Sequence, residues 1–596
     1  MLLPRVLVII IWLSSLVWGG AQEIEGEHFN PSDIVVNKDG SFFVSCSGNN
    51  EIRHYSPSGN FLAKQSIRGK PSSIVFAPDK QYLVVTSGQG EGWLTLLDVK
   101  NLRIILSQRC GHSPQAPQFS PDGKRLALAQ RFKDEVWLLD VKTWTVVHQY
   151  AVLRQPIDLK WRTDQRIVVL QHLSNRPADA EWTGCSMVQM DVSTGKFSEI
   201  TLTDGSSGAR KFALSLDGKY ALAPMVIGSF RVPATQIERG WINKNGLSVV
   251  DLDNNRVLGT LLLDDLSFGA ANPWDIQVTA KEAWISLAGI HQLMVVDLQL
   301  LIVSLEKMNP EQRENLTYDL GIGRTWKQRL ALSGKGPRAM TLSDDKSSLW
   351  VTAAFSSSVE KVDLHNREIS ILVKPQEVEP RRRGEYLFHD ASISFQHWMS
   401  CSSCHPDART DGLNWDLPND GLGSLRQGKT MLFTHFTPPT TITGIRPNAE
   451  YSVRAGVIFL RATLSEEDAS AIDAYLKQLQ PVPSPQLLDD GTLSLAARAG
   501  KEIFESKGSC SDCHNGEYLT NQKLRNVGTG LGDESDFKYD VPSLREIWRT
   551  APYLHDGRAA SLEDIFKEFN AAKRHGSADT LSAKEFGELM VYLKSL

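Results

Sequence analysis

The chain has 596 residues, of which 41% are hydrophobic and 22% are charged, and its formal net charge is −5 at pH 7. This length exceeds one ordinary hydrophobic core, so two or three domains of a soluble protein are expected. The lack of a basic excess argues against nucleic acid or an anionic membrane surface as a partner.

The first 21 residues have the pattern of an export signal. One charge, Arg5, precedes an apolar stretch from Val6 to Trp18, and small residues follow up to Ala21. We predict cleavage near Ala21 and a periplasmic or otherwise extracytoplasmic location. A retained anchor is the alternative, but about thirteen apolar residues are few for ~30 Å of hydrocarbon. No transmembrane span is therefore expected after signal removal.

Seven repeated units follow between residues 31 and 373. Each opens on a Pro- or Gly-containing segment and ends a strand on apolar-apolar-Asp, as in "FSPDGKRLALAQRFKDEVWLLDVKTWTVVHQY". The spacing of about 40 to 60 residues is typical of four-stranded propeller blades. The units resemble the YVTN family of seven-bladed propellers, with "LVVTSG" and "LWVTAA" at the place of that family's motif. We predict an all-β propeller of about seven blades.

An Asp recurs at strand ends within these units. The positions are Asp98, Asp140, Asp191, Asp251, Asp297 and Asp363. Because an Asp at a strand end accepts hydrogen bonds from turn N–H groups, we interpret these residues as structural rather than catalytic.

After Val373 the sequence changes to helical periodicity. A Pro- and charge-rich segment leads into a first section (380–480). The segment "QPVPSPQ" separates this first section from a second one (487–596). Each section ends in a similar amphipathic helix, in which Ser465 with Asp468, and Ser582 with Glu585, have the spacing of a capping box. The second half therefore has the pattern of a duplicated small α-helical domain.

The seven cysteines fall into two groups. Cys46, Cys110 and Cys185 are widely spaced and odd in number, so disulfides are not expected to organise this fold. The other four occur in two copies of one phrase, Cys401-Ser-Ser-Cys404-His405 and Cys510-Ser-Asp-Cys513-His514.

The CxxCH phrase is the pattern of covalent haem attachment. Its two thiols can form thioether bonds to the vinyl groups of a haem, and the following His becomes the proximal iron ligand. We predict two haem c groups, attached by Cys401, Cys404, Cys510 and Cys513 and ligated by His405 and His514. A zinc site of four thiolates is the alternative, although zinc has no need of a His after both pairs. A redox dithiol would need a thioredoxin-like βαβ context that the sequence lacks.

The helical half resembles the bacterial dihaem cytochrome c peroxidases and their MauG-type relatives. "RRGEYLFHDASISFQHWMSCSSCHPDARTDG" is similar to their first haem region, and "VPSLREIWRTAPYLHDGRAASLEDIFKEFN" to a segment of their second domain. The resemblance implies two α-helical cytochrome c-type domains after the propeller. It further implies that the first haem is the peroxide site, that a nearby Glu is the acid/base and that the second haem supplies or stores an electron.

The resemblance places the acid/base at Glu450, in "RPNAEYSVRAG". Its task would be to take a proton from one oxygen of peroxide and return it to the other. The alternative is a solvated Glu at a helix start, beside Arg446 and Arg454.

The face of the first haem opposite His405 leaves two alternatives open. Many peroxidases of the family have a removable distal His about sixteen residues after the first CxxCH, but no His occurs in the corresponding "GLNWDLPNDGLGSLRQG". Either this haem is permanently open, as in the MauG type, or His435 closes it.

The second haem departs further from the family. Where peroxidases have a Met and MauG-type proteins a Tyr, this sequence has Phe569, which cannot ligate iron. Met590, His575 or a displaced residue could substitute, or the position has no ligand. Met590 lies on an amphipathic helix, which favours a core role, and His575 has the setting of a loop residue. His555, in "APYLHDG", is interpreted as bonding haem or backbone rather than iron.

Two further features follow from the resemblance. Electrons need a path between the haems, for which Trp415 and Trp548 are candidates, although core packing explains a single Trp equally well. Relatives hold a calcium ion between the domains, but no carboxylate cluster in this sequence argues for one independently.

We expect a periplasmic dihaem c-type oxidoreductase that reduces hydrogen peroxide or uses it to oxidise a partner. The partner would be a small redox protein (a cytochrome c or a cupredoxin) or a protein substrate, docked by the propeller. The alternatives are a non-catalytic dihaem electron-transfer protein and a propeller-based binding protein with accessory haems.

Overall fold

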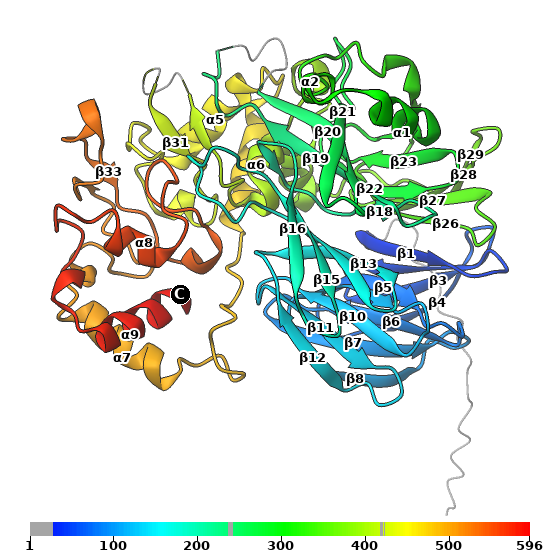
Figure 1. The fold of residues 1–596 in the computed structure, drawn as a ribbon, viewed down its shortest axis with the longest axis horizontal. Helices are drawn as coiled ribbons and strands as arrows, with labels where there is room; N and C mark the ends of the chain where they lie inside the picture. The colour runs from blue at the N-terminus through cyan, green and yellow to red at the C-terminus, as the bar shows by residue number, and fades with distance from the viewer. Residues whose placement is uncertain (1–27, 236–241, 418–420, 422) are drawn as a thin grey trace, which may run out of the picture.

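The computed structural model describes residues 28–235, 242–417, 421 and 423–596 (Figure 1). The predicted export signal (residues 1–21) lies outside these ranges. Among the residues described, no helix has the length and apolarity that a membrane crossing requires.

The N-terminal part forms a seven-bladed β-propeller, as predicted. In six blades the four strands pair antiparallel in sequence order, and in the fifth blade a short extra strand joins the edge. The first three blades consist of β1 (Pro31–Val36), β2 (Phe42–Cys46), β3 (Glu51–Tyr55), β4 (Phe61–Ser66); β5 (Pro71–Phe76), β6 (Tyr82–Ser87), β7 (Glu91–Asp98), β8 (Ile104–His112); and β9 (Pro114–Phe119), β10 (Arg125–Gln130), β11 (Glu135–Asp140), β12 (Val146–Ala151). The next two consist of β13 (Pro156–Thr163), β14 (Arg166–Gln171), β15 (Ser186–Asp191), β16 (Phe197–Thr201); and β17 (Ser206–Ser207), β18 (Ala213–Leu214), β19 (Tyr220–Gly228), β20 (Asn243–Asp251), β21 (Arg256–Leu262). The last two consist of β22 (Pro273–Val278), β23 (Glu282–Leu287), β24 (Gln292–Asp297), β25 (Lys327–Ala331); and β26 (Pro337–Leu342), β27 (Ser348–Ala353), β28 (Ser358–Asp363), β29 (Ile369–Val373).

The recurring Asp residues have the structural role predicted for them. Asp98 accepts a hydrogen bond from the N–H of Lys100 (2.8 Å), and Asp140 accepts one from Lys142 (2.9 Å). The same turn bond recurs at Asp191, Asp251 and Asp363. Asp297 instead caps a helix that the sequence did not predict, α1 (Leu298–Lys307), which with α2 (Pro310–Asn315) is inserted between β24 and β25.

The propeller closes by contact between its first and last blades. β1 lies beside β26, and the hydroxyl of Ser357 accepts hydrogen bonds from the N–H groups of Phe29 (3.1 Å) and Asn30 (3.2 Å). Apolar residues of both blades share one buried cluster that includes Phe42, Val44 and Trp350. The ring is therefore held by packing as well as by hydrogen bonds.

The helical region follows β29 and lies along one side of the propeller, yellow to red in Figure 1. It contains α3 (Arg383–His389), α4 (Cys401–Cys404), α5 (Ala449–Phe459), α6 (Glu466–Lys477), α7 (Leu495–Glu505), α8 (Leu562–Lys567) and α9 (Ala583–Lys594), with short strands β30 (Asn414–Asp416), β31 (Leu425–Gln427), β32 (Leu524–Arg525) and β33 (Tyr539–Asp540). In each section the helix before the CxxCH segment packs on the closing helix: α3 on α6, and α7 on α9.

One glycine in each section permits this packing. A Cβ on Gly384 would overlap the carbonyl of Ala471 in α6, and a Cβ on Gly500 would overlap that of Glu588 in α9. Only glycine allows helix backbones to approach so closely. Both glycines stand in the same pattern, Gly-x-x-(Leu/Ile)-Phe, which supports the duplication inferred from the sequence.

The two closing helices begin at the predicted residues. Ser582 and Glu585 form the full capping box at the start of α9. Ser465 caps α6 by accepting from the N–H of Asp468, but the Asp468 carboxylate binds Arg383 of α3 instead of returning the bond. The cap prediction is thus confirmed for both serines, and Asp468 additionally ties α3 to α6.

Candidate functional site

The first CxxCH segment forms one helical turn. Ser400 begins α4 with a capping box to Ser403, and His405 ends the turn, with its N–H donating to the carbonyl of Cys401 (3.0 Å). Burial raises the pKa of the Cys401 thiol to about 12, and it raises that of Cys404 as well. The two sulfurs thus lie on a single helical turn, where burial disfavours the thiolate form.

The propeller holds this turn in place through three asparagines. Asn243 Nδ2 lies 3.0 Å from the sulfur of Cys404, and Asn245 Nδ2 donates to the carbonyl of Trp398 (3.1 Å). Asn272 both donates to the Ser400 hydroxyl and accepts from that of Ser403, each at 2.8 Å. The blades therefore contribute directly to the surroundings of the first motif.

Both motif histidines have the hydrogen bond expected of an axial iron ligand. His405 Nδ1 lies 2.9 Å from the carbonyl oxygen of Arg409, and His514 Nδ1 lies 3.2 Å from that of Leu519. Burial lowers the pKa of both rings, so they are neutral at pH 7. A backbone carbonyl bound at Nδ1 fixes the tautomer that leaves the Nε2 lone pair free for a metal. Both motifs fit a haem by this criterion.

The zinc alternative is not supported by the geometry. It requires the four thiolates to come together, yet the described ranges contain no group of three or more His, Cys, Asp or Glu side chains that could hold a metal ion. No disulfide joins any of the seven cysteines, all of which lie in the described ranges. The same search reveals no carboxylate cluster for the calcium ion that the family resemblance implied.

Asp407, two residues after the first motif histidine, is a site residue that the sequence analysis missed. Its carboxylate lies 2.5 Å from Arg131 and 2.8 Å from Arg210, both on propeller loops, and 3.6 Å from Arg549 of the second helical section. These cations hold the pKa of Asp407 well below its usual range. Its backbone has a positive φ of 55°, a strained conformation that is often found at functional sites. The Pro-Asp pair after CxxCH is the only sequence signal for it.

Glu450 lies in the first turn of α5, away from the first motif. Its carboxylate is 40% exposed and binds Lys477 of α6 (2.8 Å), and this hydrogen bond lowers its pKa. No hydrogen bond or ion pair joins Glu450 to Cys401, Cys404 or His405. The solvated helix-start alternative thus describes its present environment.

His435 is engaged by a carboxylate. Its Nε2 lies 2.9 Å from Asp473 of α6, and Asp473 also binds Arg454 of α5. The His435 side chain is only 1% exposed. This contact occupies Nε2, whereas Nδ1 is enclosed without a hydrogen-bond partner.

The structure places the candidate ligands of the second haem in different surroundings. Phe569 faces the guanidinium of Arg558, 5.2 Å from its ring centre, and Met590 is buried in the α7–α9 core. His555 stacks on Tyr539, with 4.3 Å between the ring centres. The ring of His575, in contrast, faces that of His514, with 6.4 Å between the ring centres.

The two tryptophans proposed as electron bridges pack in different places. Trp415 is buried near Cys401 and Cys404 and donates to Asp411 (3.0 Å). Trp548 packs edge-on against Phe132 of the propeller, 5.3 Å between ring centres. Core packing accounts for Trp415, and packing against the propeller accounts for Trp548.

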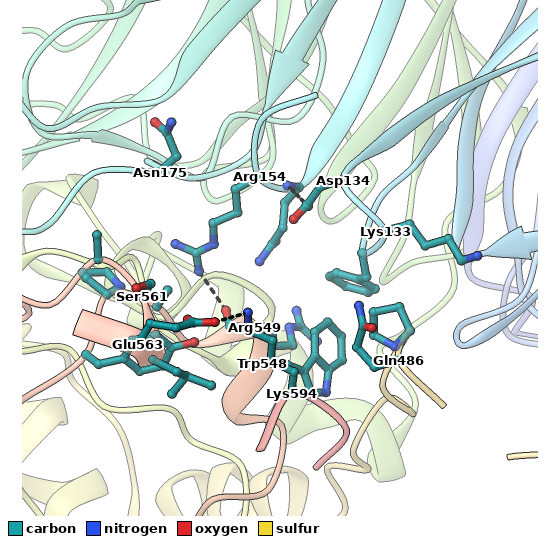
Figure 2. A pocket seen from close by; sticks show the side chains of 18 of the residues that line it. Lys133, Asp134, Arg154, Asn175, Gln486, Trp548, Arg549, Ser561, Glu563 and Lys594 are labelled. Carbon is teal, nitrogen blue, oxygen red and sulfur yellow. Dashed lines mark hydrogen bonds and ion pairs between the residues drawn. The ribbon is translucent and has the colours of Figure 1, made fainter. Parts of the chain in front are cut away.

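A polar cavity of about 390 Å³ lies between the propeller and the second section (Figure 2). Arg154 crosses it to donate to the carbonyl of Arg549 (2.8 Å), and Glu563 pairs with Lys594 at its edge (2.6 Å). Trp548 lines the cavity beside Arg549. The second section is thus attached to the propeller through the walls of this cavity.

No protein-family model matches the chain, but curated relatives do. It is 29% identical over 287 residues to the hydrazine synthase subunit gamma of Kuenenia stuttgartiensis, a match that covers 38% of this chain and 81% of that protein. It is 24% identical over 293 residues to the cytochrome-c peroxidase IdrP2 of Denitromonas iodatirespirans, covering 36% of this chain and 80% of that protein. A solved chain of Kuenenia stuttgartiensis hydrazine synthase has a TM-score of 0.53 at 20% identity and covers 58% of this chain and 99% of that one. The last likeness concerns the fold alone.

The helical part is thus similar to c-type haem proteins of the peroxidase-like oxidoreductase class, and it is joined to a seven-bladed propeller. Its homologues are dihaem cytochrome c peroxidases, MauG proteins and hydrazine synthase subunits. The family resemblance predicted from the CxxCH segments is therefore confirmed.

Proposed function

We propose that the chain is an exported dihaem c-type oxidoreductase that reduces hydrogen peroxide, or uses it to oxidise a partner, at the His405 site. Cys401 and Cys404 would attach one haem, and Cys510 and Cys513 the other. When bound, such a group supplies an iron that exchanges electrons and, where one face is open, takes a small oxidant. The observation that carries the proposal is the repeated arrangement of the motif histidines, each held at Nδ1 by a backbone carbonyl.

Peroxide chemistry at the first site requires that one face of its iron be open. The contact of His435 Nε2 with Asp473 supports the open alternative. Peroxide can bind only where the sixth position is available. Glu450 would carry the proton between the peroxide oxygens, for which its carboxylate must leave Lys477 and turn toward the site.

The propeller has an internal role in this proposal, besides the docking of a redox protein or protein substrate. Its Arg131 and Arg210 hold Asp407, and its asparagines hold the first CxxCH turn. The loops that bear these residues are covered by the helical region, so a cytochrome c, a cupredoxin or a protein substrate would dock on surfaces outside this contact.

The test begins with the holoprotein purified from an exporting host. Covalent haem is counted by the pyridine haemochrome spectrum and by the mass of the intact chain, and we expect two per chain. Rapid mixing with hydrogen peroxide should then change the absorption of one haem, and His405→Ala should abolish this reaction. A protein with two inert low-spin haems would favour the electron-transfer alternative, and a colourless protein would contradict the proposal.

A further inference from the structure

The ring of the second motif histidine has a partner across a gap. His575 lies in the loop between α8 and α9, and its ring centre is 6.4 Å from that of His514, with the two planes at 39°. Ring pairs in this protein range from 4.1 Å between centres, as in Phe43 and His54, to 6.5 Å, as in His389 and Tyr475. The two histidine rings therefore lie near the upper end of that range, tilted rather than stacked.

The distance matches a metal bound between the two rings. A metal–imidazole bond is about 2.0 Å long, and a ring centre lies about 1.1 to 1.2 Å behind its nitrogen, so two trans imidazoles place their ring centres about 6.3 Å apart. The observed separation agrees with this value.

The ring nitrogens are available for such a bond. His514 Nδ1 is occupied by the carbonyl of Leu519, which leaves its Nε2. Within the described ranges, the ring of His575 makes no hydrogen bond or ion pair, and its Nδ1 is enclosed without a partner. Buried polar atoms without a partner are rare in native proteins and call for an explanation such as a bound group.

The loop that contains His575 is fixed from two sides. The buried side chain of Asn570 donates to the His575 carbonyl (3.2 Å) and accepts from its N–H (3.1 Å). The N–H of Ser577 donates to the carbonyl of Gly508 (3.0 Å), two residues before Cys510. The backbone of His575 is therefore held by Asn570, and the residue two positions later ties the loop to the segment before Cys510.

We propose that His575 is the sixth iron ligand of the second haem, opposite His514, which makes this a bis-histidine site. The inference rests on the proposed function, because it requires a haem on Cys510 and Cys513. In this assignment the sixth ligand does not occupy the position of the family's Met or Tyr, which is Phe569 in this chain. It lies six residues later in the sequence. Two imidazoles give a six-coordinate iron that exchanges electrons but does not admit peroxide, and they give a lower potential than a His/Met pair.

The experiment compares the oxidised holoprotein with His575→Ala and His575→Met by EPR and by redox titration. We expect His575→Ala to convert one of two haems from low spin to high spin, and added imidazole to restore the low-spin signal. We expect His575→Met to keep that haem low spin and raise its midpoint potential. Lys573→Ala, an exposed change in the same loop, is the matched control and should alter neither reading. Unchanged spin state and potentials in His575→Ala would overturn the inference.

Asn570 provides a second test, because its side chain holds the loop that contains His575. Asn570→Ala removes both loop bonds without touching the ring, so a fraction of the second haem should become high spin, and imidazole should convert it back. A second haem that stays entirely low spin in this variant would contradict the positioning role. The haem count on every sample separates the two proposals. If two haems are present and the protein reacts with peroxide, but His575→Ala has no effect, only this inference is contradicted. If the second haem is missing, the proposed function is contradicted.

Discussion

Asp407 Oδ2 lies 2.5 Å from Arg131 Nη2, and this contact joins the segment after the first CxxCH motif to a propeller loop 276 residues earlier in the chain. Arg210 approaches the other carboxylate oxygen. The carboxylate thus lies among cations from two blades and is 25% exposed. Its removal would leave these cations without their counter-charge.

We expect Asp407→Asn to lower the free energy of unfolding by about 3 kcal/mol at pH 7, the usual cost of removing one partner from a buried ion pair. Since the folded-state pKa of Asp407 is depressed, its stabilising effect is complete above its usual pKa, near 4, and is lost as the pH falls through the folded value. The difference between wild type and variant should therefore shrink as the pH falls below about 4. Denaturant unfolding at several pH values measures this. Asp344→Asn, which breaks an exposed pair with Lys80, is the control and should cost at most about 1 kcal/mol.

Gly384→Ala and Gly500→Ala should each destabilise the helical region by about 2 kcal/mol or more, because the new methyl group overlaps a backbone carbonyl of the closing helix. Gly587→Ala is the matched control, since its Cβ would meet nothing within 4 Å in α9. We expect this control to raise stability by about 0.5 to 1 kcal/mol through helix propensity. Thermal unfolding compares the three variants, and equal melting temperatures would refute the close-packing argument.

Glu450→Gln should lower the rate of reaction with peroxide by about 10²- to 10⁴-fold if Glu450 carries the proton. Glu466→Gln serves as the control, because Glu466 is also a helix-start Glu paired with a cation but is 74% exposed. Rapid mixing with peroxide measures both. Identical rates in the two variants would show that Glu450 is only a surface partner of Lys477.

His435→Ala should leave the spin state of the oxidised first haem unchanged, because His435 Nε2 is already bound to Asp473. EPR of the variant and wild type at the same pH provides the comparison. A new high-spin signal in the variant would show that His435 closes the iron in the wild type. We expect a modest loss of stability in either case, since Asp473 keeps Arg454 as its partner.

Local patterns allowed much of this structure to be predicted. The propeller repeats, the turn Asp residues such as Asp140, and the caps at Ser465 and Ser582 each depend on neighbours within a few residues, and each is present. The duplicated CxxCH phrase is equally local. The repeated Gly-x-x-(Leu/Ile)-Phe could have been found as well, because both copies are in the printed sequence.

Contacts between distant segments could not be predicted. Arg131, Arg210 and Arg549 converge on Asp407 from three places in the chain, and no spacing rule connects them. The facing of His575 toward His514 depends on how the α8–α9 loop is tied to Gly508 and Asn570. Glu450 shows the opposite case, in which a loose family alignment suggested a role but could not reveal the nearby Lys477.

The two helical sections exchange ion pairs: Arg409 of the first binds Glu546 of the second (2.5 Å), and Arg549 of the second approaches Asp407 of the first. Because the propeller clamps one of these carboxylates, sliding of one section past the other would break both pairs together. In the proposed dihaem protein, the distance that an electron crosses between the two CxxCH segments should then be constant in time. Its transfer rate should be the same in buffer and in concentrated glycerol, unlike that of proteins in which a swinging domain carries the electron.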